Sequence, residues 1–162
     1  MNIIKNIYKK ILDSEALLTS TVENIKQKKL KIVFTNGCFD ILHRGHIEYL
    51  AKGKELGDIL LVALNSDESV KKLKGQDRPI NRLEDRMFLL ASLSFVDYVT
   101  NFSETTPTEI LKKIRPDIHI KGGDYSLADL PEREVIQSYG GKIYILPYVQ
   151  GYSTSNILKN KI

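Results

Sequence analysis

The chain has 162 residues, of which 42% are hydrophobic and 27% are charged. These values are typical of one compact domain with a hydrophobic core, and they exclude an intrinsically disordered chain. The longest uninterrupted apolar run, residues 59–64, is far shorter than the ~20 residues of a membrane-spanning helix. Because Cys38 is the only cysteine and the N-terminus lacks a secretory apolar segment, we expect a cytoplasmic protein without stable membrane association.

The formal net charge of +4 is confined to the first 31 residues, which contain seven lysines and three acidic residues. The rest of the chain is neutral overall. Net charge therefore gives no support for nucleic-acid binding, and the sequence has neither zinc-finger spacing nor an aromatic RNA-binding pattern. We expect no nucleic-acid partner.

Residues 1–30 are predicted to form an N-terminal helical arm ahead of a domain of residues 31–162. Apolar residues recur at helical spacing in the first half of this arm: Ile3, Ile4, Ile7, Ile11 and Leu12. A second helix is expected around residues 17–25. The apolar stripe of the first helix must pack on the domain or on a second subunit, the alternative being a membrane surface.

From residue 31 onward, short β-branched runs alternate with segments of helical periodicity. Five strands are predicted, at residues 32–35, 59–65, 98–100, 118–121 and 143–147. Helices are predicted at residues 45–56, 82–93, 108–114, 130–139 and 153–161. Such alternation favours an α/β fold, a five-stranded parallel sheet with helices on both faces and ligands bound beyond the carboxyl ends of the strands.

Asn36-Gly37 allows a second interpretation, because this dipeptide between two apolar runs is also typical of a β-hairpin. A hairpin would leave the remaining strand and helix alternation unexplained. We therefore favour a tight turn from the first strand into a helix that begins near Gly45. Such a helix start directs free backbone N–H groups at one point and suits a phosphate group.

His43-Arg44-Gly45-His46 stands at this helix start, where Walker A and Gly-x-Gly-x-x-Gly sequences are both missing. Two histidines three residues apart lie on one face, so both rings can donate hydrogen bonds to phosphate oxygens. The same residues could be incidental polar side chains, or could form a metal site together with Cys38. The spacing alone leaves these alternatives open.

Residues 35–46, Thr-Asn-Gly-Cys-Phe-Asp-Ile-Leu-His-Arg-Gly-His, resemble the signature of the H-x-G-H nucleotidyltransferase superfamily. Residues 151–155, Gly-Tyr-Ser-Thr-Ser, resemble its second signature, Ile-Ser-Thr-Thr, although Tyr152 and Ser155 depart from it. Within the superfamily the chain is most similar to the D-glycero-beta-D-manno-heptose 1-phosphate adenylyltransferase family. This resemblance also rests on residues 65–67, 73–75, 78–79, 121–125 and 153–157.

The resemblance implies a Rossmann-like nucleotidyltransferase fold, a homodimer, ATP and a heptose 1-phosphate as substrates, and Mg²⁺ held mainly by the ATP phosphates rather than by protein ligands. It implies that His43, His46 and Lys74 are the catalytic residues. It also implies a set of nucleotide- and phosphate-binding residues: Thr35, Asn36, Gly37, Phe39, Lys71, Arg86, Gly123, Asp124, Ser153, Thr154 and Ser155. For Arg86 an ion pair is an equal alternative, and the 121–124 segment could be a plain β-to-α turn.

Two other functions remain open. A cytidylyltransferase acting on glycerol 3-phosphate or a phosphorylated amino alcohol would share the fold and the chemistry. Those enzymes often have Arg-Thr-x-Gly before the second signature, whereas this chain has Tyr148-Val149-Gln150-Gly151, which favours adenylyl transfer. A non-catalytic nucleotide-binding module is the second alternative, and the presence of both histidines argues against it.

Overall fold

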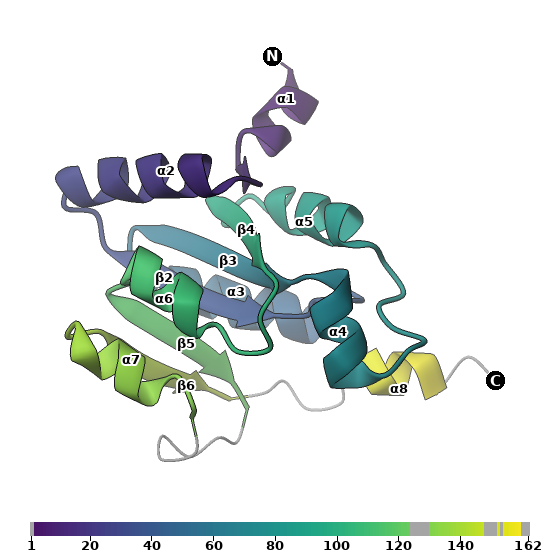
Figure 1. Cartoon of the computed structure of the whole chain (residues 1–162). Helices are drawn as coiled ribbons and strands as arrows, with labels where there is room; N and C mark the ends of the chain where they lie inside the picture. Colours follow the sequence, from purple (N-terminus) through teal and green to yellow (C-terminus); the bar gives the residue numbers. More distant parts are fainter. Residues whose placement is uncertain (1, 124–129, 148–151, 153, 160–162) are drawn as a thin grey trace.

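The structure, a computed structural model, describes residues 2–123, 130–147, 152 and 154–159. In this part of the chain six strands form one parallel sheet in the order β1-β4-β3-β2-β5-β6 (Figure 1). The strands are β1 (Ile11–Leu12), β2 (Ile32–Gly37), β3 (Ile59–Asn65), β4 (Tyr98–Phe102), β5 (Ile118–Gly122) and β6 (Lys142–Leu146). The predicted parallel α/β architecture is confirmed.

Helices cover both faces of the sheet (Figure 1). One face carries α2 (Glu15–Gln27), α6 (Thr108–Ile114) and α7 (Arg133–Ser138), and the other carries α3 (Arg44–Lys54) and α5 (Leu83–Ala91). Successive side chains of a strand point to opposite faces, so Phe34 is buried against the first group of helices and Val33 against the second. Burial on both faces explains the continuous apolar run of β3.

Three shorter helices complete the described elements: α1 (Ile3–Tyr8), α4 (Asp67–Lys74) and α8 (Thr154–Lys159). The periodicity did not predict α4, because most of its side chains are charged and exposed. Its start is fixed locally, since the Ser66 side chain accepts a hydrogen bond from the backbone N–H of Ser69. None of the described helices is long and apolar enough to span a membrane.

The N-terminal arm differs from its prediction. The helix α1 ends at Tyr8, and Ile11 and Leu12 form a strand that pairs with Val99 and Thr100 of β4. The expected strand count of five is therefore wrong by one. Edge strand β4 offers unpaired backbone groups, and pairing with them outweighs the local preference of this segment for helix.

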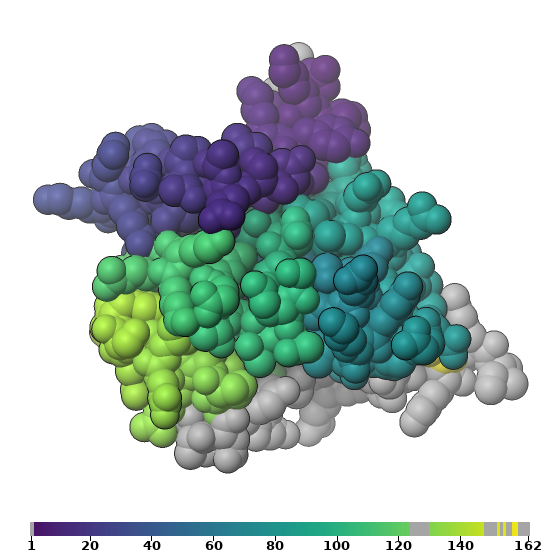
Figure 2. Space-filling model, viewed as in Figure 1, coloured from purple at the N-terminus to yellow at the C-terminus, as the bar shows by residue number. Residues whose placement is uncertain are grey.

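The second helix of the arm packs on the sheet. Leu18, Val22 and Ile25 of α2 are buried in the same cluster as Phe34. In contrast, no side chain of α1 is buried, and α1 projects from the body of the molecule (Figure 2). Its Tyr8 ring lies 5.5 Å from the Phe88 ring of α5. The apolar stripe of α1 is therefore covered only in part, by the domain.

The hairpin interpretation of Asn36-Gly37 is wrong. Both residues belong to β2, which pairs in parallel with β3 on one side and with β5 on the other. The chain then continues into α3. Because β2 lies in the middle of the sheet, with β3 and β5 reached by connections in opposite directions, the crevice between the carboxyl ends of β2 and β5 is a topological switch point, where α/β proteins bind ligands.

Candidate active site

The turn from β2 into α3 holds the two predicted catalytic histidines. His43 is the N-cap of α3, and its Nδ1 accepts a hydrogen bond of 3.4 Å from the backbone N–H of His46. The side-chain cap fixes the first turn of the helix. The positive end of the helix dipole, the free backbone N–H groups and both imidazole rings therefore meet at one place.

The two imidazole rings are stacked, with centroids 3.8 Å apart and planes inclined by 20°. Burial lowers the pKa of His43, and burial together with the neighbouring His43 lowers the pKa of His46 to about 4. Both rings are therefore neutral at neutral pH. Nδ1 of His46 is buried and makes no hydrogen bond to a described residue, and the backbone of Ile41 acts on the ring in the opposite direction by raising its pKa.

Phe39 and Gly37 shape the wall beside His46. The Phe39 ring lies 5.2 Å from the His46 ring, and Phe39 has a positive φ of 46°. A Cβ atom on Gly37 would lie 3.0 Å from Cε2 of Phe39, a tight contact that the Phe39 ring would have to relieve by moving a few tenths of an ångström. Glycine at position 37 leaves room for the Phe39 ring in its present position.

The second signature reaches the first. A Cβ atom on Gly45 would lie 3.1 Å from Cβ of Tyr152, so the backbones approach closely at the start of α3. The guanidinium group of Arg44 lies 5.8 Å from the centre of the Tyr152 ring. Thr154 then begins α8. Segments separated by more than a hundred residues thus meet at the histidine turn.

Part of the predicted phosphate cap cannot be placed. Ser153 and Asp124 lie outside the described residues, and so does the side chain of Ser155. Gly123 is buried after β5, with a φ of 124°, and its backbone N–H donates a 3.0 Å hydrogen bond to the carbonyl of Leu146. The predicted contacts of these residues with a nucleotide stay predictions.

The predicted lysines Lys71 and Lys74 are exposed on α4, three residues apart on the helix. Burial raises the pKa of Cys38, and the positive charges of Lys74 and Arg86 act in the opposite direction. Lys74 therefore lies close enough to the first signature for its charge to be felt there. Its side chain is not fixed by any hydrogen bond within the described residues.

The model of the cytidylyltransferase-like family matches residues 34–159, which is most of the chain. The chain belongs to the cytidylyltransferase-like family. The match spans both the histidine turn and α8.

Individual proteins are also similar to this chain. The bifunctional protein HldE of Helicobacter hepaticus is 47% identical over 98% of this chain, although the chain spans only about a third of that protein (32%). A solved lipopolysaccharide core biosynthesis protein of Thermoplasma volcanium is 31% identical, with a TM-score of 0.62 over 76% of this chain and 99% of that one. A pantoate-beta-alanine ligase of Francisella tularensis, at 20% identity and a TM-score of 0.65 over 94% of this chain and 73% of that one, shares the fold.

In this member of the cytidylyltransferase-like family Arg86 forms an ion pair, which is one of the two roles considered for it from the sequence. Its side chain is fully buried, and Nη2 lies 2.7 Å from the carboxylate of Asp67. It also donates hydrogen bonds to three backbone carbonyls, those of Cys38, Asn65 and Asn81. These contacts join the first signature to the end of β3 and the start of α5. A phosphate contact by Arg86 stays a prediction.

Thr35 and Asn36 face opposite sides of the sheet. Thr35 is fully buried, and its hydroxyl lies 2.6 Å from the hydroxyl of Tyr49 on α3. Asn36 is half-buried, and its side-chain oxygen accepts a hydrogen bond of 3.3 Å from Lys121. Nucleotide binding by either residue stays a prediction.

Asp40 is a site residue to which the sequence analysis gave no role. Its carboxylate is 2% exposed and accepts hydrogen bonds from the backbone N–H groups of Ile80 and Asn81 and from Nε of Arg78. Burial alone raises its pKa, but these three donors together hold it below the usual value. Asp40 thereby clamps residues 78–81 to the first signature. An acidic residue inside an otherwise apolar stretch of the signature was the available signal.

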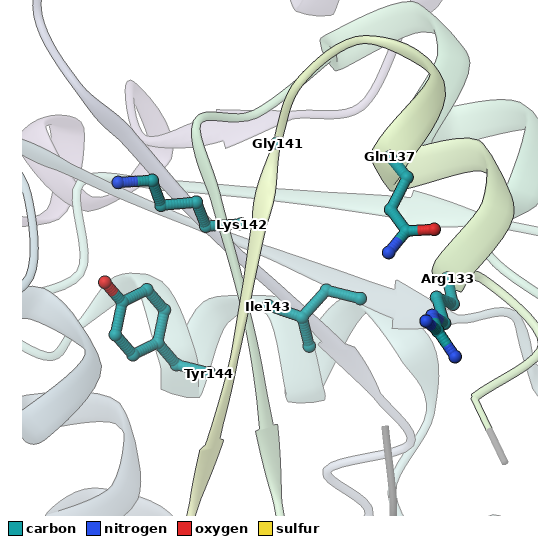
Figure 3. Close-up of a pocket in the computed structure, with 6 residues that line it drawn as sticks. All are labelled: Arg133, Gln137, Gly141, Lys142, Ile143 and Tyr144. Carbon is teal, nitrogen blue, oxygen red and sulfur yellow. The ribbon is translucent and has the colours of Figure 1, made fainter. Parts of the chain in front are cut away.

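The described residues contain no group of three His, Cys, Asp or Glu side chains arranged to hold a metal ion. A surface hollow of about 370 Å³ lies at the outer strand β6, between it and α7 (Figure 3). Its lining residues are Arg133, Gln137, Gly141, Lys142, Ile143 and Tyr144. No predicted site residue is among them, so this hollow is separate from the histidine turn.

Proposed function

We propose that this chain transfers the adenylyl group of ATP to a heptose 1-phosphate, giving ADP-heptose and pyrophosphate. The observation that carries the proposal is the close approach of Tyr152 to Gly45, which brings both nucleotidyltransferase signatures to the start of α3. Membership of the cytidylyltransferase-like family supports the reaction class.

The chemistry needs positioned donors rather than a protein nucleophile. A phosphate oxygen of the acceptor attacks the α-phosphorus of ATP, the bond from that phosphorus to the bridging oxygen breaks, and pyrophosphate leaves with the electron pair. The acceptor is already an anion, so no protein base has to remove a proton. The protein has to hold two anionic groups in line and close together, where they repel each other by several kcal/mol.

The start of α3 suits this task. His46 is neutral and donates a hydrogen bond to the α-phosphate as negative charge develops there, while His43 and the free N–H groups of the first helical turn hold the triphosphate. Lys74 and Lys71 supply positive charge from α4, and Thr154 supplies a hydroxyl from α8.

Mg²⁺ belongs to the proposal as a cofactor. We infer that the ion is held mainly by the nucleotide phosphates, because Mg²⁺ usually binds through one or two carboxylates together with substrate phosphates. When bound, Mg²⁺ neutralises phosphate charge and so lowers the repulsion between the substrates.

The choice of base and acceptor rests on the relatives. The chain is 47% identical to the Helicobacter hepaticus HldE protein, and 31% identical to a lipopolysaccharide core biosynthesis protein. A cytoplasmic location and a homodimer are parts of the same proposal, and sedimentation analysis tests the dimer. The sequence before the second signature, Tyr148-Val149-Gln150, lacks the Arg-Thr pair of many cytidylyltransferases.

A screen of pyrophosphate release tests the proposal. The four nucleoside triphosphates are each combined with several sugar 1-phosphates and with glycerol 3-phosphate, in the presence of Mg²⁺. We expect turnover with ATP and a heptose 1-phosphate. A His46→Ala variant purified in the same way controls for contaminating enzymes. Turnover with CTP and glycerol 3-phosphate, without release from ATP and heptose 1-phosphate, would overturn the proposal in favour of a cytidylyltransferase.

A further inference from the structure

Lys121 joins a buried carboxylate to a predicted site residue. It lies near the end of β5, and its Nζ is 2.6 Å from Oε1 of Glu132 and 3.3 Å from Oδ1 of Asn36. A lysine ammonium group has only donors, so the Asn36 atom that faces it must be the amide oxygen. The Asn36 NH2 group therefore points away from Lys121.

Glu132 holds Lys121 in this position. The carboxylate belongs to the N-cap residue of α7 and is only 2% exposed. On the same face of β5, Nε2 of the fully buried His119 lies 3.4 Å from the same Oε1. Burial raises the pKa of Glu132, but His119 and the Lys121 charge outweigh it and lower the pKa to about 2. Burial lowers the pKa of His119. The group therefore consists of Glu132⁻, Lys121⁺ and a neutral histidine.

A buried ion pair is a weak stabiliser, because apolar side chains of similar volume often serve the fold as well. The presence of such a pair therefore needs a reason other than stability. Here the pair ends on Asn36, a residue of the first signature at the β2–β5 switch point. No described residue accepts a hydrogen bond from the Asn36 NH2 group.

We propose that Glu132, acting through Lys121, fixes the Asn36 amide in the orientation in which its NH2 group donates to an oxygen of the bound substrate. Glu132 and Lys121 are positioning residues. The acceptor is a phosphate or hydroxyl oxygen of the nucleotide or of the sugar phosphate. This inference rests on the proposed function for its kinetic part, whereas its geometric part concerns the free protein.

The geometric part is tested by nuclear magnetic resonance of the free, ¹⁵N-labelled protein. The Asn36 side-chain amide is assigned by its loss in Asn36→Ala. We expect an order parameter for this amide near ~0.8 in the wild type and below ~0.6 in Glu132→Gln, because the amide then rotates freely. Equal order parameters in the two proteins would overturn the inference.

The kinetic part compares three variants. Glu132→Gln is expected to lower kcat/KM about tenfold, because a misplaced donor no longer meets the substrate. The matched control is Glu134→Gln, an exposed glutamate on the same helix, which should stay within about twofold of the wild type. A rise in KM for ATP would place the acceptor oxygen on the nucleotide. A rise in KM for the sugar phosphate would place it on the sugar phosphate, and either result supports the inference.

The double variant Lys121→Met/Glu132→Gln separates positioning from stability. It removes both charges, so no unpaired buried charge is left to unfold the protein. We expect its kcat/KM to remain about tenfold low, because Asn36 has lost its donor. Recovery to the wild-type value would mean that charge balance alone matters, and would overturn the inference. If the wild type releases no pyrophosphate with any substrate pair, the proposed function fails and the order parameters alone decide the positioning role.

Discussion

The histidine turn and Arg86 were both predicted to bind phosphate, yet their surroundings differ. Arg86 is fully buried and gives its N–H groups to one carboxylate and three backbone carbonyls. In the histidine turn, Nδ1 of His46 is buried without a hydrogen-bond partner among the described residues, and its pKa is lowered to about 4.

The difference separates a residue that holds the site together from one that we propose binds a ligand. A polar group that already has protein partners stabilises the fold, and its removal leaves those partners unsatisfied. A buried polar atom without a partner costs free energy, and a ligand can supply the missing hydrogen bond. Changing Arg86 should therefore reduce stability, whereas changing His46 should reduce turnover.

Arg86→Met is expected to have the largest effect. The change leaves three backbone carbonyls and the partly exposed Asp67 carboxylate without their donor, and at ~1–3 kcal/mol for each unsatisfied buried group the free energy of unfolding should fall by about 3–5 kcal/mol. Urea denaturation measures this loss. Arg82→Met, at the exposed N-cap arginine of the same helix, is the matched control and should change stability by less than about 0.5 kcal/mol. Similar losses in both variants would refute the role of Arg86.

His46→Ala is expected to lower turnover by about 10²-fold or more, because its hydrogen bond strengthens as charge builds on the α-phosphate. ATP binding, measured by calorimetry, should weaken far less. Thermal unfolding checks that the variant is folded. A folded variant that keeps more than about a tenth of the wild-type turnover would contradict this role.

A pH series should show the next largest effect. The folded-state pKa of His46, about 4, lies below the ordinary value of 6.5, so only the unfolded chain binds the proton between these values. The contribution of neutral His46 to the free energy of unfolding is complete above pH 6.5. This contribution is lost as pH falls toward 4, by about 2–3 kcal/mol. His119 acts in the same direction. Urea denaturation of His46→Asn should therefore show a weaker pH dependence than the wild type, and an unchanged dependence would refute the assignment.

Lys74→Met should have the smallest effect. Its side chain is exposed on α4 and its charge acts on Cys38 of the first signature, so we expect a rise of less than about tenfold in KM for ATP and little change in stability. Lys72→Met is the matched control, because position 72 faces a different side of the helix. Steady-state kinetics of both variants measure KM for ATP. Equal KM values would remove Lys74 from the site.

The sequence predicted the histidine turn well, because its signature is local. Residues 35–46 are consecutive, and a helix that begins at Arg44, with His43 as its N-cap, places both histidines on one face without help from distant parts of the chain. The partners of Asp40 and Asn36 could not be predicted in this way. Their donors, at residues 78–81 and at Lys121, lie some 38 to 85 positions away, and no periodicity reports which of many polar residues will meet.

By itself, the sequence determined where five strands and most helices lie along the chain, because alternating apolar runs and helical stripes are properties of neighbouring residues. Only the tertiary structure decided that Ile11 and Leu12 form a strand, since the open edge of β4 supplies the hydrogen bonds that favour it. The tertiary structure also decided that Arg86 forms an ion pair and hydrogen bonds within the protein. Four acceptors from three segments meet around that side chain, and such a convergence exists only after the chain has folded.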